Sequence, residues 1–198
     1  MKHYISHNKD LLDSIIILFI AGALTALFCT SNMTDSLLLE YSHVLRSTLV
    51  MPQDAGQFFL EQCLSHVLFC LLLLFLGFSL FGIPLIQFCV FLKGFQIGFS
   101  AYLFLVTYQL KGILGILFTL LPQIVFDMAA ISIIAVSALQ CSGMLISALT
   151  EHPNDVQLLP LINQKLNSFL ISCSIALFSS AVKSTIGLVL IDYFIKIE

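Results

Sequence analysis

Long apolar segments are the feature that most constrains how this chain folds. The hydrocarbon core of a bilayer is about 30 Å thick, and a helix needs about 20 apolar residues to cross it. The chain supplies about five such segments, at residues 11–30, 58–81, 84–108, 122–149 and 166–193. Only 10% of the residues are charged and 59% are hydrophobic, whereas an ordinary soluble domain has about 25% charged residues. The sequence therefore predicts an all-α, polytopic transmembrane helix bundle that occupies residues 1–198 as a single integral membrane domain.

The intervals between these segments add two further elements to the prediction. Residues 31–57 form the one long polar interval, and apolar positions recur at helical spacing after Thr34, which is typical of an amphipathic helix at the membrane surface. Pro122 removes a backbone donor and clashes with the preceding turn, so residues 112–121 are predicted to form a separate re-entrant half-helix. Residues 150–165 are polar and predict a loop before the last span.

The N-terminal segment indicates how the bundle is oriented. Its apolar run continues past the small residues at 21–23 that resemble a cleavage site, so we expect an uncleaved anchor rather than a signal peptide. Lys2 and Lys9 precede the first span, whereas Arg46 is the one basic residue of the longer 31–57 interval. Because Lys and Arg concentrate in cytoplasmic loops, we expect a cytoplasmic N-terminus and an external 31–57 interval.

Charge and motif content argue against several classes of function. A formal net charge of −3, without clustered Lys and Arg, argues against a nucleic-acid partner. The six cysteines lie in or beside apolar runs without zinc-ligand spacing, and no HExxH, phosphate-binding loop or dinucleotide-binding turn occurs, so we expect no metal and no cofactor. An intramembrane serine hydrolase would need a pair such as Ser142 and His66, but no nucleophile motif surrounds Ser142. We therefore expect no catalytic residue and no enzyme activity.

Lys93, Asp127 and Lys183 are the residues least expected inside a bilayer. An ionised side chain at mid-bilayer costs from about 2.5 kcal/mol upward, and it is retained where it is paired or wetted. One interpretation is an ion or proton path lined by these three residues. We favour a structural role, because a proton relay usually needs several acids. Either Asp127 pairs with Lys93 or Lys183 and holds helices together, or the lysines snorkel to an interface.

Small residues mark positions where helices approach one another closely. Gly94 and Gly98 have the GxxxG spacing that lets two helix backbones come into contact. The pattern suits packing within the chain and packing against a partner chain about equally, so homo-oligomerisation is left open.

Three short motifs follow one another in the middle of the chain. They read LGFSLFGIP at residues 76–84, FLKGFQIGF at 91–99 and LPQ at 121–123. In order and spacing they resemble the LG-S--G-P, LKG---GF and PQ signatures of the stage II sporulation protein M family. The residue after Pro-Gln is commonly Asn in that family and is Ile124 here. The residues that carry the resemblance are Gly77, Gly82, Pro84, Lys93, Gly94, Gly98, Pro122 and Gln123.

The resemblance implies a bacterial cell-membrane protein that acts in septal thinning and engulfment during sporulation. It further implies assembly with stage II sporulation proteins D and P, which carry lytic transglycosylase and amidase/endopeptidase chemistry, while this chain serves as a non-catalytic scaffold in the lipid bilayer. The alternative, from a different class, is a channel or the membrane subunit of a transporter that uses Lys93, Asp127 and Lys183.

Overall fold

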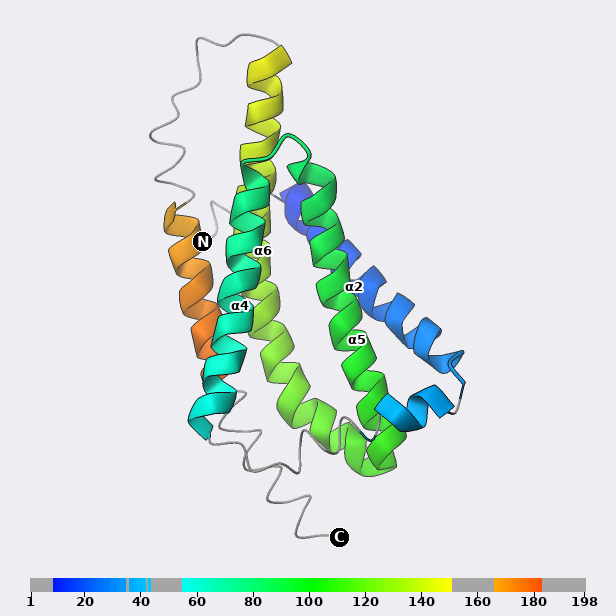
Figure 1. The fold of residues 1–198 in the computed structure, drawn as a ribbon. Coiled ribbons are helices and arrows are strands. Elements are labelled where there is room, and N and C mark those ends of the chain that lie inside the picture. The colour runs from blue at the N-terminus through cyan, green and yellow to red at the C-terminus, as the bar shows by residue number, and fades with distance from the viewer. Residues whose placement is uncertain (1–8, 35, 42, 44–54, 151–165, 183–198) are drawn as a thin grey trace.

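A computed structural model describes residues 9–34, 36–41, 43, 55–150 and 166–182 (Figure 1). These residues are almost entirely helical and contain no strand. The elements are α2 (Lys9–Ser31), α4 (Ala55–Gly77), α5 (Gly82–Gly115), a π-helical turn η1 (Ile116–Leu120), α6 (Leu121–Thr150) and a helix of residues Leu166–Val182, here named the C-terminal helix. The predicted all-α bundle is confirmed.

Four helices in the described part of the chain are long and apolar enough to cross a membrane. They are Lys9–Ser31, Phe59–Gly77, Gly82–Gln109 and Leu121–Ile146. Of the fifth predicted span, 166–193, the structure describes Leu166–Val182, and the remainder lies outside the described residues. Large apolar side chains point outward along the helices, as at Leu60 and Phe75, which are 66% and 75% exposed. Because so much apolar surface suits lipid rather than water, the chain is a multi-pass membrane protein.

The bundle is built around α6. In its most apolar window 56% of the residues are buried, against 28% in α5 and 22% in α2 and α4. α4 and the C-terminal helix lie along one side of α6, and α2 lies along α5 on the other side (Figure 1). Fully buried side chains from α4, α5 and α6 fill the centre, among them Leu73, Ile86, Val90 and Ile134.

Glycines set the distance between α2 and α5. A Cβ atom at Gly94 would overlap the backbone carbonyl oxygen of Phe19, and one at Gly98 would overlap that of Ala23. The relation is reciprocal, because a Cβ at Gly22 of α2 would overlap the carbonyl oxygen of Phe91. The GxxxG spacing of α5 is therefore used inside the chain, where it lets two helix backbones touch.

The turn between α4 and α5 is fastened to α6. Ser142 of α6 donates a hydrogen bond from Oγ to the backbone oxygen of Ser79 at 2.8 Å. A Cβ atom at Gly77 would lie 2.9 Å from Cα of Ala138, and one at Gly82 would lie 2.9 Å from the Ser142 Oγ. These two glycines let the turn approach α6 closely, and Pro84 follows in the first turn of α5, where a missing N–H is tolerated.

The segment predicted as a half-helix, residues 112–121, is helical, and it continues into α6 rather than ending at Pro122. The chain reverses at a single residue, Gln109, whose φ and ψ are 51° and −126°. Residues 110–150 then run as one helical segment that includes η1, and Ile116 keeps helical angles of −61° and −47°. Pro122 does not break this segment because the wider π-helical turn directly before it relieves the missing N–H and the ring clash.

The predicted surface helix is described only in its first part. Residues 36–41 are helical, and the ring of Tyr41 lies edge-on against Phe99 of α5 with centroids 5.5 Å apart. Residues 44–54 lie outside the described part of the chain.

Candidate functional site

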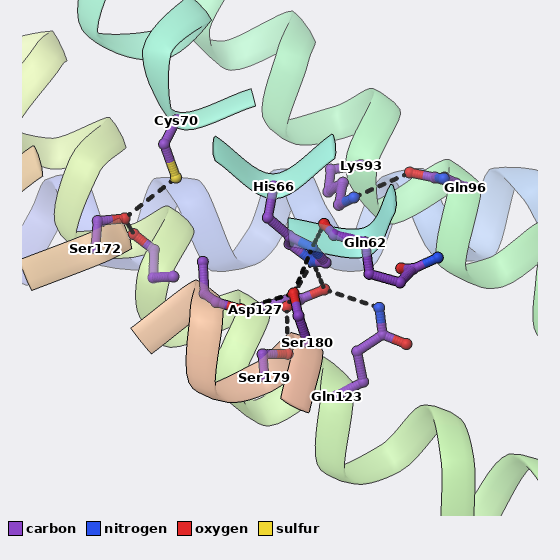
Figure 2. A network of polar contacts seen from close by, with 12 residues as sticks. Gln62, His66, Cys70, Lys93, Gln96, Gln123, Asp127, Ser172, Ser179 and Ser180 are labelled. Carbon is purple, nitrogen blue, oxygen red and sulfur yellow. Dashed lines mark hydrogen bonds and ion pairs between the residues drawn. The ribbon is translucent and has the colours of Figure 1, made fainter. Parts of the chain in front are cut away.

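A group of polar side chains is enclosed between α4, α6 and the C-terminal helix. It consists of His66, Gln123, Asp127, Ser179 and Ser180, here named the buried polar cluster (Figure 2). His66 is 7% exposed, Asp127 is 1% exposed, and both serines are fully buried. Polar groups so enclosed are retained when they satisfy one another.

Asp127 is the centre of the buried polar cluster. Nε2 of His66 lies 3.0 Å from its Oδ1 and 3.1 Å from its Oδ2. Ser179 donates from Oγ to Oδ1 at 2.8 Å, and Gln123 donates from Nε2 to Oδ2 at 3.2 Å. The donors come from α4, the C-terminal helix and α6, so one carboxylate joins three segments that are far apart in the sequence.

The second ring nitrogen of His66 anchors this pair to the backbone of α4. Nδ1 lies 2.8 Å from the backbone oxygen of Gln62, and a carbonyl oxygen only accepts hydrogen bonds, so Nδ1 donates. Nε2 faces the Asp127 carboxyl group, and one proton between these two groups joins the side chains as a buried pair.

A second polar contact joins the same three segments about one helical turn further along α6. Ser172 of the C-terminal helix donates from Oγ to the backbone oxygen of Ala130 at 2.7 Å, and its Oγ lies 3.5 Å from Sγ of Cys70 on α4. All six cysteines are free thiols in the structure. Both polar links use short side chains, so the helices can pack closely around them.

The ion pair predicted between Lys93 and Asp127 is wrong. Lys93 instead donates from Nζ to Oε1 of Gln96 at 3.2 Å and lies 5.5 Å from the centroid of the Phe69 ring. The other predicted partner, Lys183, lies outside the described residues. The partner of the carboxyl group is instead an imidazole supplied by α4.

Sequence reasoning missed His66 as the partner of Asp127, although a signal was present. α4 and α6 run in the same direction, and each residue lies about 10 Å from the start of its apolar span at 1.5 Å per residue. Two polar residues at the same depth on parallel spans are natural partners.

The hydrolase pair considered from the sequence is not assembled. Ser142 bonds to the turn at Ser79, about 22 Å along α6 from Asp127, whereas His66 contacts Asp127. Ser180 does lie 3.3 Å from Nδ1 of His66, in the connectivity of a serine–histidine–aspartate triad.

The geometry of this second arrangement does not activate the serine. Nδ1 of His66 is occupied by the carbonyl of Gln62, so it cannot accept the Ser180 proton, and Ser180 itself donates to the backbone oxygen of Ala176 at 3.0 Å. Ser180 is also fully buried, whereas a nucleophile must reach a substrate carbonyl. Within the described residues no three His, Cys, Asp or Glu side chains gather as metal ligands.

A pocket of about 310 Å³ opens between α4 and α5, outside the buried polar cluster. It is here named the α4–α5 pocket. Its walls are Ser65, Leu68, Phe69, Leu72, Leu92, Lys93 and Gln96. Most of its wall is apolar, and the ammonium of Lys93 is its one charged group.

Comparison with known proteins identifies a protein family. The family model described as stage II sporulation protein M matches residues 15–191, a range that includes the three sequence motifs, the buried polar cluster and the α4–α5 pocket. No curated protein and no solved structure matches the chain.

Proposed function

The chain belongs to the stage II sporulation protein M family and is a sporulation-related membrane protein, and from this premise we propose that it is a non-catalytic scaffold. In this proposal it assembles and localises peptidoglycan-degrading enzymes in the bacterial cell membrane during septal thinning and engulfment. Its partners are stage II sporulation proteins D and P, which supply the lytic transglycosylase and amidase/endopeptidase chemistry.

The observation that carries the proposal is how the buried polar cluster is used. Every hydrogen-bonding atom of Asp127 and His66 is directed at another helix or at the local backbone. These contacts fix helix positions and leave neither Asp127 nor His66 available to a substrate or a moving ion, although Oε1 of Gln123 is buried without a hydrogen-bond partner. A rigid bundle with an apolar exterior is what a platform for other membrane proteins requires.

The channel or transporter alternative has less support from the same geometry. Lys93 and Asp127 do not face a common path, because Asp127 is enclosed while Lys93 lines the α4–α5 pocket. Solute or ion flux into proteoliposomes that contain this chain alone would favour the alternative. Flux no greater than in empty liposomes is the result expected of a scaffold.

Localisation of the two enzymes tests the proposal directly. The chain is expressed in a spore-forming bacterium that lacks its own family member and carries fluorescent fusions of proteins D and P. We expect the fusions to gather at the sporulation septum and engulfment to resume, as judged with a membrane dye. Septal fusions that do not depend on this chain would refute the scaffold function.

A matched pair of variants separates folding from recruitment in that experiment. His66→Leu breaks the buried polar cluster and should abolish localisation through loss of folded protein, measured by immunoblot of membranes. Leu64→Ala, at an exposed position of the same helix outside the α4–α5 pocket, should leave both the protein level and the localisation unchanged.

A further inference from the structure

The starting point is Lys93, a buried cation that forms no ion pair with a described residue. Asp127 is fully engaged with His66, Ser179 and Gln123, so Lys93 has no carboxylate within ion-pair distance among the described residues. An ammonium has three donors, and Lys93 finds one acceptor, Oε1 of Gln96.

Lys93 lies deep in the membrane, where an ammonium with too few hydrogen-bond acceptors is costly. It is about 16 Å along α5 from Gly82, roughly half of a 30 Å hydrocarbon core. The side chain is 9% exposed, and the exposed part faces the α4–α5 pocket between apolar walls. Charged side chains at this depth are retained where a partner or water compensates them.

The apolar walls of the α4–α5 pocket are suited to a helix. Leu68 and Leu72 are spaced one helical turn apart on α4, and Leu92 faces them from α5; they are 55%, 45% and 45% exposed. Such side chains form the ridges between which a neighbouring helix packs. At one depth in the membrane, the pocket thus presents both the Lys93 ammonium and apolar side chains against which a helix can pack.

We infer that the α4–α5 pocket binds a transmembrane helix of a partner protein that carries an Asp or Glu side chain near its middle. The carboxylate forms an ion pair with Lys93, and the apolar residues of the helix pack on Leu68, Leu72 and Leu92. This inference rests on the proposed scaffold function, for which it names the chemistry of the partner.

A second copy of this chain does not supply the carboxylate. Among the described residues the exposed acids nearest to this depth are Asp13 and Glu61. Asp13 lies about 9 Å along α2 from Phe19, which packs on Gly94, and Glu61 lies about 12 Å along α4 from Phe69, which contacts Lys93. Two copies side by side in one membrane place equivalent residues at equal depth, so neither acid would reach Lys93.

A designed helix provides the test. The full chain is reconstituted in liposomes with a synthetic peptide of about 20 Leu and Ala residues that carries one central Glu, or Gln in the control peptide. The photo-crosslinker benzoylphenylalanine replaces Leu68 in the pocket or, as a matched lipid-facing position, Leu24 on α2, which is 60% exposed. At limiting peptide we expect about tenfold more adduct for the Glu peptide than for the Gln peptide at Leu68, and no difference at Leu24.

Lysine variants assign the effect to Lys93. Lys93→Gln should remove the preference for the Glu peptide and Lys93→Arg should keep it, since arginine keeps the charge. Lys9→Gln, which removes an exposed lysine at the start of α2, should keep it too. If Lys93→Gln fails to fold, the comparison of the Glu and Gln peptides on the protein that retains Lys93 still tests the inference.

Several results would overturn the inference. Equal adducts with the two peptides at Leu68 would remove the role of the carboxylate, and a preference retained in folded Lys93→Gln would remove the role of the lysine. An adduct from Leu68 to this chain's own residues, or to a second copy, would mean that another occupant fills the pocket. Loss of the peptide preference with intact septal recruitment would refute this site alone, whereas recruitment independent of the chain would refute the scaffold function alone.

Discussion

Breaking the His66–Asp127 pair should be among the most destabilising changes in this protein. In Asp127→Leu His66 loses its buried partner, and Ser179 and Gln123 lose their acceptor. In His66→Leu the buried carboxyl group keeps those two donors but loses the one ion-pair partner that it has among the described residues. Removing one partner of a buried ion pair costs about 3–5 kcal/mol, because it leaves an uncompensated charge. We expect each single variant to lie in this range.

The double variant, His66→Leu with Asp127→Leu, tests the pairing more strictly. With both charges gone, two leucines fill the space and the penalty of the orphaned ion disappears, so the double variant should lose less stability than the sum of the two singles. We expect a coupling energy of about 2 kcal/mol or more between the two positions. Reversible unfolding in mixed micelles, followed by circular dichroism, gives the three free energies.

A remote hydrogen bond serves as the control for this cycle. Ser142→Ala removes the bond to Ser79, about 22 Å along α6 from Asp127. Its effect should add to that of His66→Leu within about 0.5 kcal/mol, because distant sites behave independently. If the losses in His66→Leu and Asp127→Leu also simply add, the ion pair does not hold the helices together and the reasoning fails.

Three further predictions concern packing, backbone strain and orientation. Gly94→Leu should abolish monodisperse folded protein in size-exclusion chromatography because it collides with α2, whereas Gly143→Leu, with nothing within 4 Å of the glycine Cβ position, should be tolerated; similar profiles would contradict this. Gln109→Gly should raise the free energy of unfolding by about 1 kcal/mol, since a residue without Cβ adopts φ of 51° more easily, and a loss would show that no strain is stored there. Single cysteines at Ser6 and Ser42, both outside the described residues, should be labelled from opposite sides of the membrane; labelling of both from outside would reverse the N-terminus.

The fold class followed from hydropathy because membrane solvation imposes a simple rule. An apolar run of bilayer length forms a helix whatever its neighbours, so α2, α4, α5 and α6 were expected close to where they lie. The continuity of the helix through Pro122 could not be predicted from the sequence. A proline shows that a backbone donor is missing, but it does not show how the helix compensates for the loss. Here a π-helical turn compensates, and the chain reverses at Gln109, in the interval expected between the third span and the predicted half-helix.

The buried polar cluster was predictable in kind and not in detail. Asp127 had to be paired, since an isolated carboxylate in hydrocarbon is too costly. The choice of partner depended on which spans lie side by side, and sequence alone does not give this. α4 packs along α6, so His66 faces Asp127, and the serines of the C-terminal helix complete the contacts.

Two kinds of contact hold the helices of this bundle together, and the interface between α4 and α5 is less constrained by them than the other interfaces. α2 and α5 are joined by backbone contact at Gly22, Gly94 and Gly98, and such contact tolerates no inserted group. α4, α6 and the C-terminal helix are joined by the buried polar cluster, whose ion pair is equally exacting. α4 and α5 are joined to each other by the turn at residues 78–81, and they pack less extensively against one another than either packs against α6. The α4–α5 pocket and the Lys93 ammonium lie at this interface. A partner helix can therefore bind there without disturbing the glycine contacts between α2 and α5 or the buried polar cluster.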